Sequence, residues 1–219
     1  MSGNTQRRAA RLLGCTKNTV ERKFLWLATF KTELNLNVQD EMHLQIDELE
    51  TIEHTKLKPL TIPLCVNSNY KIIALSVGKI RAKGHLSDIS LKKYGHRDDQ
   101  RGQALTELFE KLKGLKIKPI SITTDAHPLY PLLIQKYFPY VEHVRIVSGD
   151  HLKKKRELIY TAERKKLFDP LFALNQRIAM LRADIRRLTR RSWCTTKKIE
   201  NLKHHLELYQ IYNNQILTA

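Results

Sequence analysis

The sequence predicts an α/β protein, with a mixed five-stranded sheet and flanking helices that follow a small helix-turn-helix. Two observations predict this class. Apolar residues alternate at strand spacing over residues 43–80, and beyond residue 103 helical and extended patterns take turns along the chain. With 42% apolar residues among 219, the chain can bury one core of about 100–200 residues plus a small accessory part. We therefore expect a helix-turn-helix at 1–30, a linker at 31–40 and one α/β domain at 41–219.

The first strands should form an antiparallel meander. Alternation predicts strands at 43–53, 60–66 and 70–80, with a turn at 67–69, and residues 84–102 should form a loop. The later patterns predict, in chain order, a helix at 103–112, a strand at 119–124, a helix at 129–138, a strand at 142–147 and long helices at 168–190 and 195–211. Three strands, a helix, a strand, a helix, a strand and then helices is the element order of the ribonuclease-H fold.

Residues 5–28 predict two short helices around a turn at Gly14, with Thr16 as the N-cap of the second helix. This pattern is typical of a helix-turn-helix whose second helix enters DNA. The residues expected to contact DNA are Arg7, Arg8, Lys17, Asn18, Thr19, Arg22 and Lys23. The alternative is an ordinary helical hairpin with basic, solvated faces. A three-helix unit would need a further helix upstream, so we expect this N-terminus to be shortened.

Charge is abundant and unevenly distributed. The chain has 39 Lys and Arg against 22 Asp and Glu, a formal net charge of +17, which favours a polyanionic partner. Residues 145–203 hold 17 basic and 6 acidic residues, whereas residues 41–54 hold five acids and no Lys or Arg. An acidic spot beside a basic stretch suits metal-dependent chemistry on DNA or RNA, and the partner that we expect is double-stranded DNA. The basic residues expected to grip phosphates there are Arg186, Arg187, Arg190, Arg191, Lys197 and Lys198.

Three carboxylates are the candidate catalytic and metal-binding residues: Asp47, Asp125 and Glu200. Asp125 comes 78 positions after Asp47, and Glu200 a further 75, so only a fold that gathers a first strand, a later strand and a late helix can unite them. Asp47 follows an apolar residue within a strand, where a charge is costly unless it is paired or metal-bound. Asp125 lies where a strand ends, and Glu200 in the first turn of a helix. Together they would hold Mg²⁺, with Mn²⁺ as a substitute, for two-metal phosphoryl transfer.

Each acid also has an ordinary explanation. Asp47 could be a strand carboxylate on a solvent face, with Glu48 or Glu50 as the true ligand. Asp125 could begin a turn or cap the helix after Pro128. Glu200 could complement a helix dipole, and its competitors as third acid are Glu207, Glu163 and Asp184.

Composition also bounds the cellular setting. Cys15, Cys65 and Cys194 are odd in number and widely spaced, which supports neither a disulfide framework nor a zinc site. No apolar run approaches the roughly 18 residues of a membrane span, and the first residues lack a signal-peptide core. We expect a cytoplasmic protein that is associated with the nucleoid and has no membrane partner.

Specific runs of residues carry a family resemblance. Phe168-Asp-Pro-Leu-Phe-Ala-Leu-Asn175 and the Arg-rich run from Arg186 to Lys198 resemble the C-terminal region of short bacterial insertion-sequence transposases with an Asp-Asp-Glu triad. Similar agreement extends upstream through Asp47-Glu-Leu-Glu50, Asp125-Ala-His-Pro128 and Lys136-Tyr-Phe-Pro139, and covers most of residues 5–214.

This resemblance implies a ribonuclease-H-like catalytic domain and a DNA transposase that acts as an oligomer on terminal repeats and target DNA. By position, Asp47 and Asp125 match the first two acids of the family, and Glu200 matches the third. Relatives begin with a Cys-rich zinc-binding segment before the helix-turn-helix, which this sequence lacks.

Two other functions share these features. A truncated, non-catalytic regulator would bind the ends of the element without cutting them, and a ribonuclease acting on hybrids would share the fold and metals but would not need the N-terminal helices. Transposase and regulator both predict salt-sensitive DNA binding, and only the transposase predicts Mg²⁺-dependent nicking.

Overall fold

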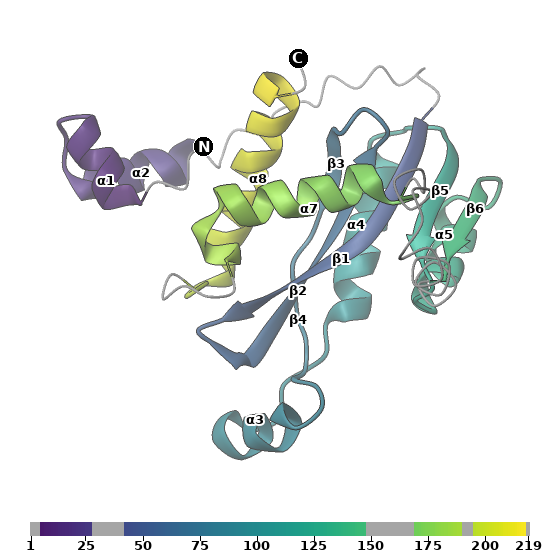
Figure 1. The fold of residues 1–219 in the computed structure, drawn as a ribbon, viewed down its shortest axis with the longest axis horizontal. Coiled ribbons are helices and arrows are strands. Elements are labelled where there is room, and N and C mark those ends of the chain that lie inside the picture. Colours follow the sequence, from purple (N-terminus) through teal and green to yellow (C-terminus); the bar gives the residue numbers. More distant parts are fainter. Residues whose placement is uncertain (1–4, 28–41, 148–168, 190–194, 218–219) are drawn as a thin grey trace, which may run out of the picture.

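The computed structural model describes residues 5–27, 42–147, 169–189 and 195–217. These residues form a mixed α/β fold with a six-stranded mixed sheet and, among them, seven α-helices (Figure 1). The strand order is β3-β2-β1-β5-β6, and β4 pairs with β2 beside this path. The sheet therefore has one strand more than the five that the sequence predicts.

A long hairpin forms the centre of the sheet. β1 (Met42–Glu53) pairs antiparallel with β2 (Thr55–Asn67), and His54 makes the tight turn between them with φ of 59°. After the turn at 67–69, β3 (Ile72–Leu75) pairs antiparallel with β2. The predicted antiparallel meander is thus confirmed, with β2 longer than expected.

The other half of the sheet is parallel. β5 (Pro119–Asp125) lies beside β1, and β6 (Glu142–Ile146) lies beside β5, both in parallel pairing. Crossovers between parallel strands need a connection such as a helix. Here α4 (Arg101–Gly114) precedes β5, and α5 (Leu129–Tyr137) joins β5 to β6.

Helices cover both faces of the sheet, so β1 is buried on both sides. On one face α4 and α5 pack against Leu44 and Ile46 of β1. On the other, α7 (Phe172–Asp184) and α8 (Ile199–Tyr212) pack against Leu49 of β1 and alternate residues of β2 from Leu60 to Val66. Burying this apolar surface at about 25 cal/mol per Å² is the main source of stability. The consequence for function is that alternate residues of β1 face different helical layers.

Three elements differ from the sequence prediction. The predicted strand at 70–80 breaks at Ser76, whose hydroxyl donates to the Ala104 carbonyl of α4, and the chain resumes as the two-residue strand β4 (Gly78–Lys79). The predicted loop at 84–102 contains a helix, α3 (Leu86–Tyr94). The predicted helix at 168–190 ends at Asp184 and is followed by a 3-10 turn (Arg186–Leu188), because Ile185 adopts an extended conformation that buries its side chain.

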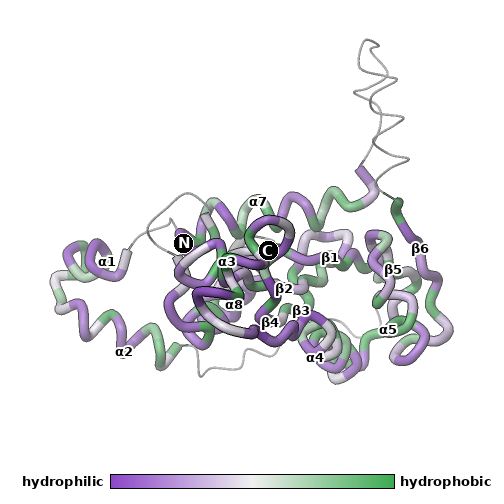
Figure 2. Tube along the Cα trace, turned by 90° about the horizontal axis from the view of Figure 1, so that it is seen from below, coloured by the Kyte–Doolittle hydropathy of each residue, from purple (hydrophilic) through white to green (hydrophobic). Residues whose placement is uncertain are grey.

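The N-terminal helices lie beside α8 and extend away from the sheet (Figures 1 and 2). α1 (Gln6–Leu12) and α2 (Lys17–Leu27) are separated by Gly14, whose φ of 61° suits a residue without a Cβ. Thr16 accepts a hydrogen bond from the Thr19 amide and caps α2 as predicted. Phe24 contacts His204 and His205 of α8, and a π-helical turn (Asn213–Leu217) follows α8.

No helix among the described residues is both long and apolar enough to cross a membrane.

Candidate active site

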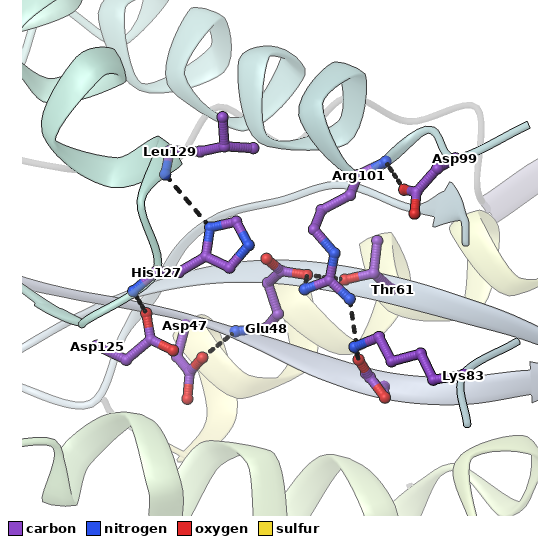
Figure 3. Close-up of polar contacts among 10 residues, drawn as sticks. Asp47, Glu48, Thr61, Lys83, Asp99, Arg101, Asp125, His127 and Leu129 are labelled. Atoms are coloured by element: carbon purple, nitrogen blue, oxygen red, sulfur yellow. Dashed lines mark hydrogen bonds and ion pairs between the residues drawn. The ribbon is translucent and has the colours of Figure 1, made fainter. Parts of the chain in front are cut away.

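Two aspartates from distant parts of the sequence lie side by side. Ile46 of β1 and Thr124 of β5 are partners in the parallel ladder, so the next residues, Asp47 and Asp125, are neighbours on strands that lie about 4.8 Å apart. Both carboxylates are on the face of the sheet opposite Ile46, and the close-up shows them next to each other (Figure 3). The pairing of first strand and later strand expected from the sequence is therefore present.

The electrostatics of Asp47 reflect this position. Burial disfavours its charged form and is the largest cause that raises its pKa from 3.8 to about 6, and the nearby carboxylates of Asp125 and Glu48 raise it further. The Glu48 amide donates to Asp47 Oδ1 at 2.6 Å and opposes this rise. At neutral pH the site therefore holds adjacent negative charges with little compensation, which favours a cation between them.

Asp125 has a structural role as well. Its Oδ1 accepts a hydrogen bond from the His127 amide at 3.0 Å, an Asx-type turn that shapes the start of α5. The turn thus uses one oxygen, and among the described residues no donor reaches Oδ2. The turn role and a ligand role are compatible, because the first fixes the direction in which the second oxygen points.

Glu48 belongs to the opposite face of β1 and already has partners. Its carboxylate forms an ion pair with Arg101 of α4 at 2.8 Å and accepts a hydrogen bond from Thr61 of β2. Arg101 also bonds Glu50 at 3.0 Å, and Lys83 bonds Glu50 at 2.9 Å (Figure 3). Glu48 and Glu50, the alternatives to Asp47 as metal ligand, are therefore held by cationic side chains.

A buried tyrosine lies under the acidic pair. The side chain of Tyr130 on α5 is fully buried, and its hydroxyl has no hydrogen-bond partner within the described residues. Burial, followed by the charges of Glu48, Asp47 and Asp125, raises its pKa well above the usual value. The hydroxyl therefore stays protonated at neutral pH.

The start of α7 covers the pair from the other side. Gln45, two residues before Asp47 on the same face of β1, donates to the Pro170 carbonyl and accepts from the Leu174 amide. These two bonds fix the first turn of α7 against β1. The carboxylate of this turn, Asp169, accepts hydrogen bonds from the Leu171 amide and the Asn175 side chain.

The structure does not bring Glu200 to the two aspartates. Thr196 pairs with Glu53, at the far end of β1, and α8 begins three residues later with Glu200 exposed in its first turn. Six residues of strand separate Asp47 from Glu53, about 20 Å at 3.3 Å per residue. Local sequence could not reveal this, because the offset arises from where the chain after α7 joins β1.

The competitors for the third acid are also elsewhere. Asp184 accepts a hydrogen bond from the Tyr209 hydroxyl, and Glu207 lies 3.6 Å from His204. Glu163 lies outside the described residues. Within 5–27, 42–147, 169–189 and 195–217, no three His, Cys, Asp or Glu side chains are grouped so that they could hold a metal ion.

The predicted DNA-binding residues lie on exposed surfaces at separate places. In α1 and α2, Arg7, Arg8, Lys17, Asn18, Arg22 and Lys23 are exposed and Thr19 is half-buried. Near α8, Arg186, Lys197 and Lys198 are exposed and Arg187 is half-buried. Arg190 and Arg191 lie outside the described residues.

Sequence reasoning missed Arg101 and Tyr130. Arg101 begins a helix that was expected to start two residues later, so nothing in its neighbourhood indicated a contact with β1. Tyr130 follows Asp125 by five residues, and its only signal was an aromatic residue in the first turn of a short helix. The partners of both residues come from β1, about 50 and 80 residues earlier.

The carboxylate oxygens of Asp47 and Asp125 could supply part of the coordination of a divalent cation. Carboxylate oxygens are the ligands that Mg²⁺ prefers, and Mg²⁺ keeps several waters when it binds through one or two carboxylates. A cation there would offset both causes of the raised pKa of Asp47, which are burial first and the nearby carboxylates second. The two aspartates are the residues that would hold it.

Comparisons with known proteins add little. No protein-family model and no curated protein matches the chain. Among solved structures, it is similar to a chain in the cryo-EM structure of the simian T-cell lymphotropic virus intasome in complex with the PP2A regulatory subunit B56 gamma, with 15% sequence identity and a TM-score of 0.32. The match covers 82% of this chain but only 62% of that one. A similarity this low establishes neither a shared fold nor a shared function.

Proposed function

We propose that this protein is the DNA transposase of an insertion element, with a ribonuclease-H-like catalytic domain that cleaves DNA and transfers the strand with Mg²⁺. The observation that carries the proposal is the adjacency of Asp47 and Asp125 at the end of a parallel strand, with the pKa of Asp47 raised to about 6. Paired carboxylates that repel each other are stable at neutral pH when they share a cation.

Bound Mg²⁺ would polarise the scissile phosphate and activate the attacking hydroxyl. The protein's own contribution is positional. β1 and β5 hold the two carboxylates, the amide of His127 orients Asp125, and Gln45 fixes α7 over the site. The net charge of +17 supports a DNA substrate, and the transposase resemblance of residues 168–198 supports transposition rather than another phosphoryl transfer.

Nicking of supercoiled plasmid tests the proposal. The parent protein should nick in Mg²⁺ or Mn²⁺ and not in EDTA, and it should join a 3′-hydroxyl oligonucleotide to the plasmid. Asp47→Asn and Asp125→Asn should each lower nicking by at least about 100-fold, because each removes a charged metal ligand. Asp98→Asn is the matched control, since Asp98 is exposed on the loop before α4. Equal activity in all four proteins would refute the metal role of the pair.

A DNA-binding regulator that does not cut is the second candidate. The position of Glu200 favours it, because this acid is exposed near the Glu53 end of β1, whereas Asp47 lies in the middle of the strand. The same assay separates the two functions. A parent protein that binds the plasmid tightly but does not nick it in either metal would support the regulator.

A further inference from the structure

Lysines from three separate elements gather at one end of the sheet, around the turn of the β1–β2 hairpin. Thr195 donates to the His54 carbonyl and Thr196 pairs with Glu53, which brings the start of α8 to this turn. Ser90 of α3 donates to the Leu57 carbonyl of β2, which brings α3 to the same end. We call the resulting group the tip surface; its lysines are Lys56, Lys58, Lys92, Lys93, Lys197 and Lys198.

The charge of the tip surface is not neutralised locally. Among the described residues, none of its six lysines forms an ion pair with a carboxylate. The acids of the neighbouring part of β1 are occupied by other cations: Glu53 by Arg97 at 3.0 Å, and Glu50 by Lys83 and Arg101. Asp88, on α3 itself, is exposed and has no cationic partner within the same residues. Against the six lysines stand two exposed acids of the same elements, Asp88 on α3 and Glu200 in the first turn of α8, so the local balance remains positive.

An aromatic ring lies among these lysines. Tyr94 at the end of α3 is 40% exposed, with Lys58 Nζ 4.3 Å and Lys93 Nζ 5.6 Å from its ring centroid. Cations near a ring face are attracted to it, so both ammonium groups are held near one point. Their separation in sequence is 35 positions, which makes this a tertiary arrangement and not a local run of charge.

α3 projects from the sheet but is firmly attached (Figure 1). Besides the bond from Ser90 to β2, Arg97 bonds Glu53 and the Pro59 carbonyl, and Arg81 Nε donates to the Arg97 carbonyl. These bonds close the segment from 81 to 97 against the hairpin. These bonds therefore fix the position of α3, and of its lysines, relative to the hairpin.

We propose that the tip surface binds the phosphate backbone of duplex DNA next to the site of cleavage. The inference rests on the proposed function, because it takes DNA as the substrate. β1 connects the two sites directly: Glu53 lies about 20 Å along the strand from Asp47, which corresponds to about six base pairs at 3.4 Å each. DNA whose scissile phosphate reached Asp47 and Asp125 would meet the tip surface within one helical turn.

An anionic membrane is the other partner that such chemistry could suit, since Ile89 and Leu91 of α3 are 50% and 54% exposed. Two observations favour DNA. The lysines come from β2, α3 and the start of α8 and so do not form one amphipathic helix. In addition, the tip surface surrounds the turn at the end of β1, the strand that carries Asp47.

Fluorescence anisotropy with a labelled random duplex of about 40 base pairs, without divalent metal, tests the inference. The triple variant Lys58→Gln/Lys92→Gln/Lys93→Gln should bind at least about tenfold more weakly than the parent. Its slope of log affinity against log salt should fall by about 2.7, as expected for three lost phosphate contacts. The matched control is Lys113→Gln/Lys118→Gln/Lys136→Gln, which removes three exposed lysines near the end of the sheet where β5 begins. The control should lose less than about twofold.

Equal losses in the two triple variants would overturn the inference, because net charge alone would explain them. Unchanged DNA binding of the tip variant would also overturn it. So would a parent and a control variant that bind phosphatidylglycerol vesicles when the tip variant does not. Because Lys58 is half-buried against Tyr94, thermal unfolding of each variant checks that the substitutions leave the fold intact. The plasmid assay tests cleavage separately. If the parent protein fails to nick plasmid while the tip variant binds DNA more weakly than the parent, cleavage is refuted and the binding surface is supported.

Discussion

At the scale of single residues, the site combines two carboxylates that the fold brings together at a cost. Asp47 has a raised pKa because folding buries it near Asp125, so the folded protein binds its proton more tightly than the unfolded chain does. The contribution of such a group to stability is complete below the unfolded pKa of 3.8 and is lost as pH rises through about 6. Without a bound metal ion, the charged form of Asp47 should therefore destabilise the folded protein at neutral pH.

Asp47→Asn should stabilise the metal-free protein at pH 8 by about 1–3 kcal/mol, because it removes a buried charge that has a like-charged neighbour. The gain should vanish near pH 4, where the parent is itself protonated. Urea unfolding at the two pH values in EDTA measures the difference. Adding Mg²⁺ at pH 8 should stabilise the parent and not the variant. A variant that is less stable than the parent at pH 8 would contradict this electrostatic account.

The hydroxyl of Tyr130 makes a second residue-scale prediction. Because it is buried and has no partner within the part of the chain that the structure describes, Tyr130→Phe should leave the free energy of unfolding unchanged or raise it by up to about 1 kcal/mol. Tyr130→Ala should lower it by about 3–5 kcal/mol, since the ring itself is fully buried. Chemical denaturation of both variants tests the pair. A large loss in the Phe variant would mean that the hydroxyl has a partner, such as a bound water.

At the scale of elements, a largely buried salt bridge joins α4 to β1 at the residue that follows Asp47. The side chain of Glu48 is only 6% exposed and that of Arg101 is 16% exposed. Arg101→Met should therefore cost about 3–5 kcal/mol, because it leaves Glu48 charged and buried. The double variant Glu48→Gln/Arg101→Met should cost clearly less than the single one. Equilibrium unfolding checks this, and a double variant as unstable as the single would show that packing of Arg101, not its charge, matters.

The junction of β4 with α4 is a second point of close contact. A Cβ added at Gly78 would lie 2.9 Å from the Ala104 side chain and 2.9 Å from the Gln100 carbonyl. Gly78→Ala should therefore cost about 1–3 kcal/mol as α4 shifts outward. Thermal unfolding measures the loss, with Gly114→Ala as the control, because a Cβ there meets nothing within 4 Å. Equal changes in the two variants would show that the contact at Gly78 is easily relaxed.

The elements differ in how far the sequence predicted them. β1, β5 and β6 were found within one or two residues, because alternation in β1 and β6 and an apolar run that ends at Asp125 in β5 are local signals. α3 was missed because its exposed apolar residues show no buried stripe, and only Ser90 is buried. The break of α7 at Ile185 depends on packing beneath α8, which no local pattern reveals.

The candidate site was also predicted only in part. Asp47 and Asp125 could be paired because a charge in an apolar strand and an acid at a strand end are each visible locally. Glu200 was chosen for its place in a first helical turn, but the position of α8 depends on the ladder between Glu53 and Thr196. Likewise, the ion pair of Glu48 with Arg101 depends on a crossover of about 50 residues.

At the scale of the whole molecule, the N-terminal helices are joined to the rest through α8. The ring of Phe24 lies 4.3 Å from that of His205, measured between centroids. Burial, together with the charges of Arg187 and His204, lowers the pKa of His205 from 6.5 to about 4. Because the pKa is lowered, the neutral form stabilises the fold above pH 6.5, and this stabilisation is lost as pH falls toward 4.

Phe24→Ala should therefore raise the pKa of His205 by about one unit, because the imidazole loses the aromatic cover that excludes water. NMR titration of the imidazole resonances, assigned with His205→Asn, measures this directly. Leu12→Ala is the control, since Leu12 is 70% exposed on α1. A pKa that stays near 4 in the Phe24 variant would locate the burial of His205 entirely within α8 and the 3-10 turn before it.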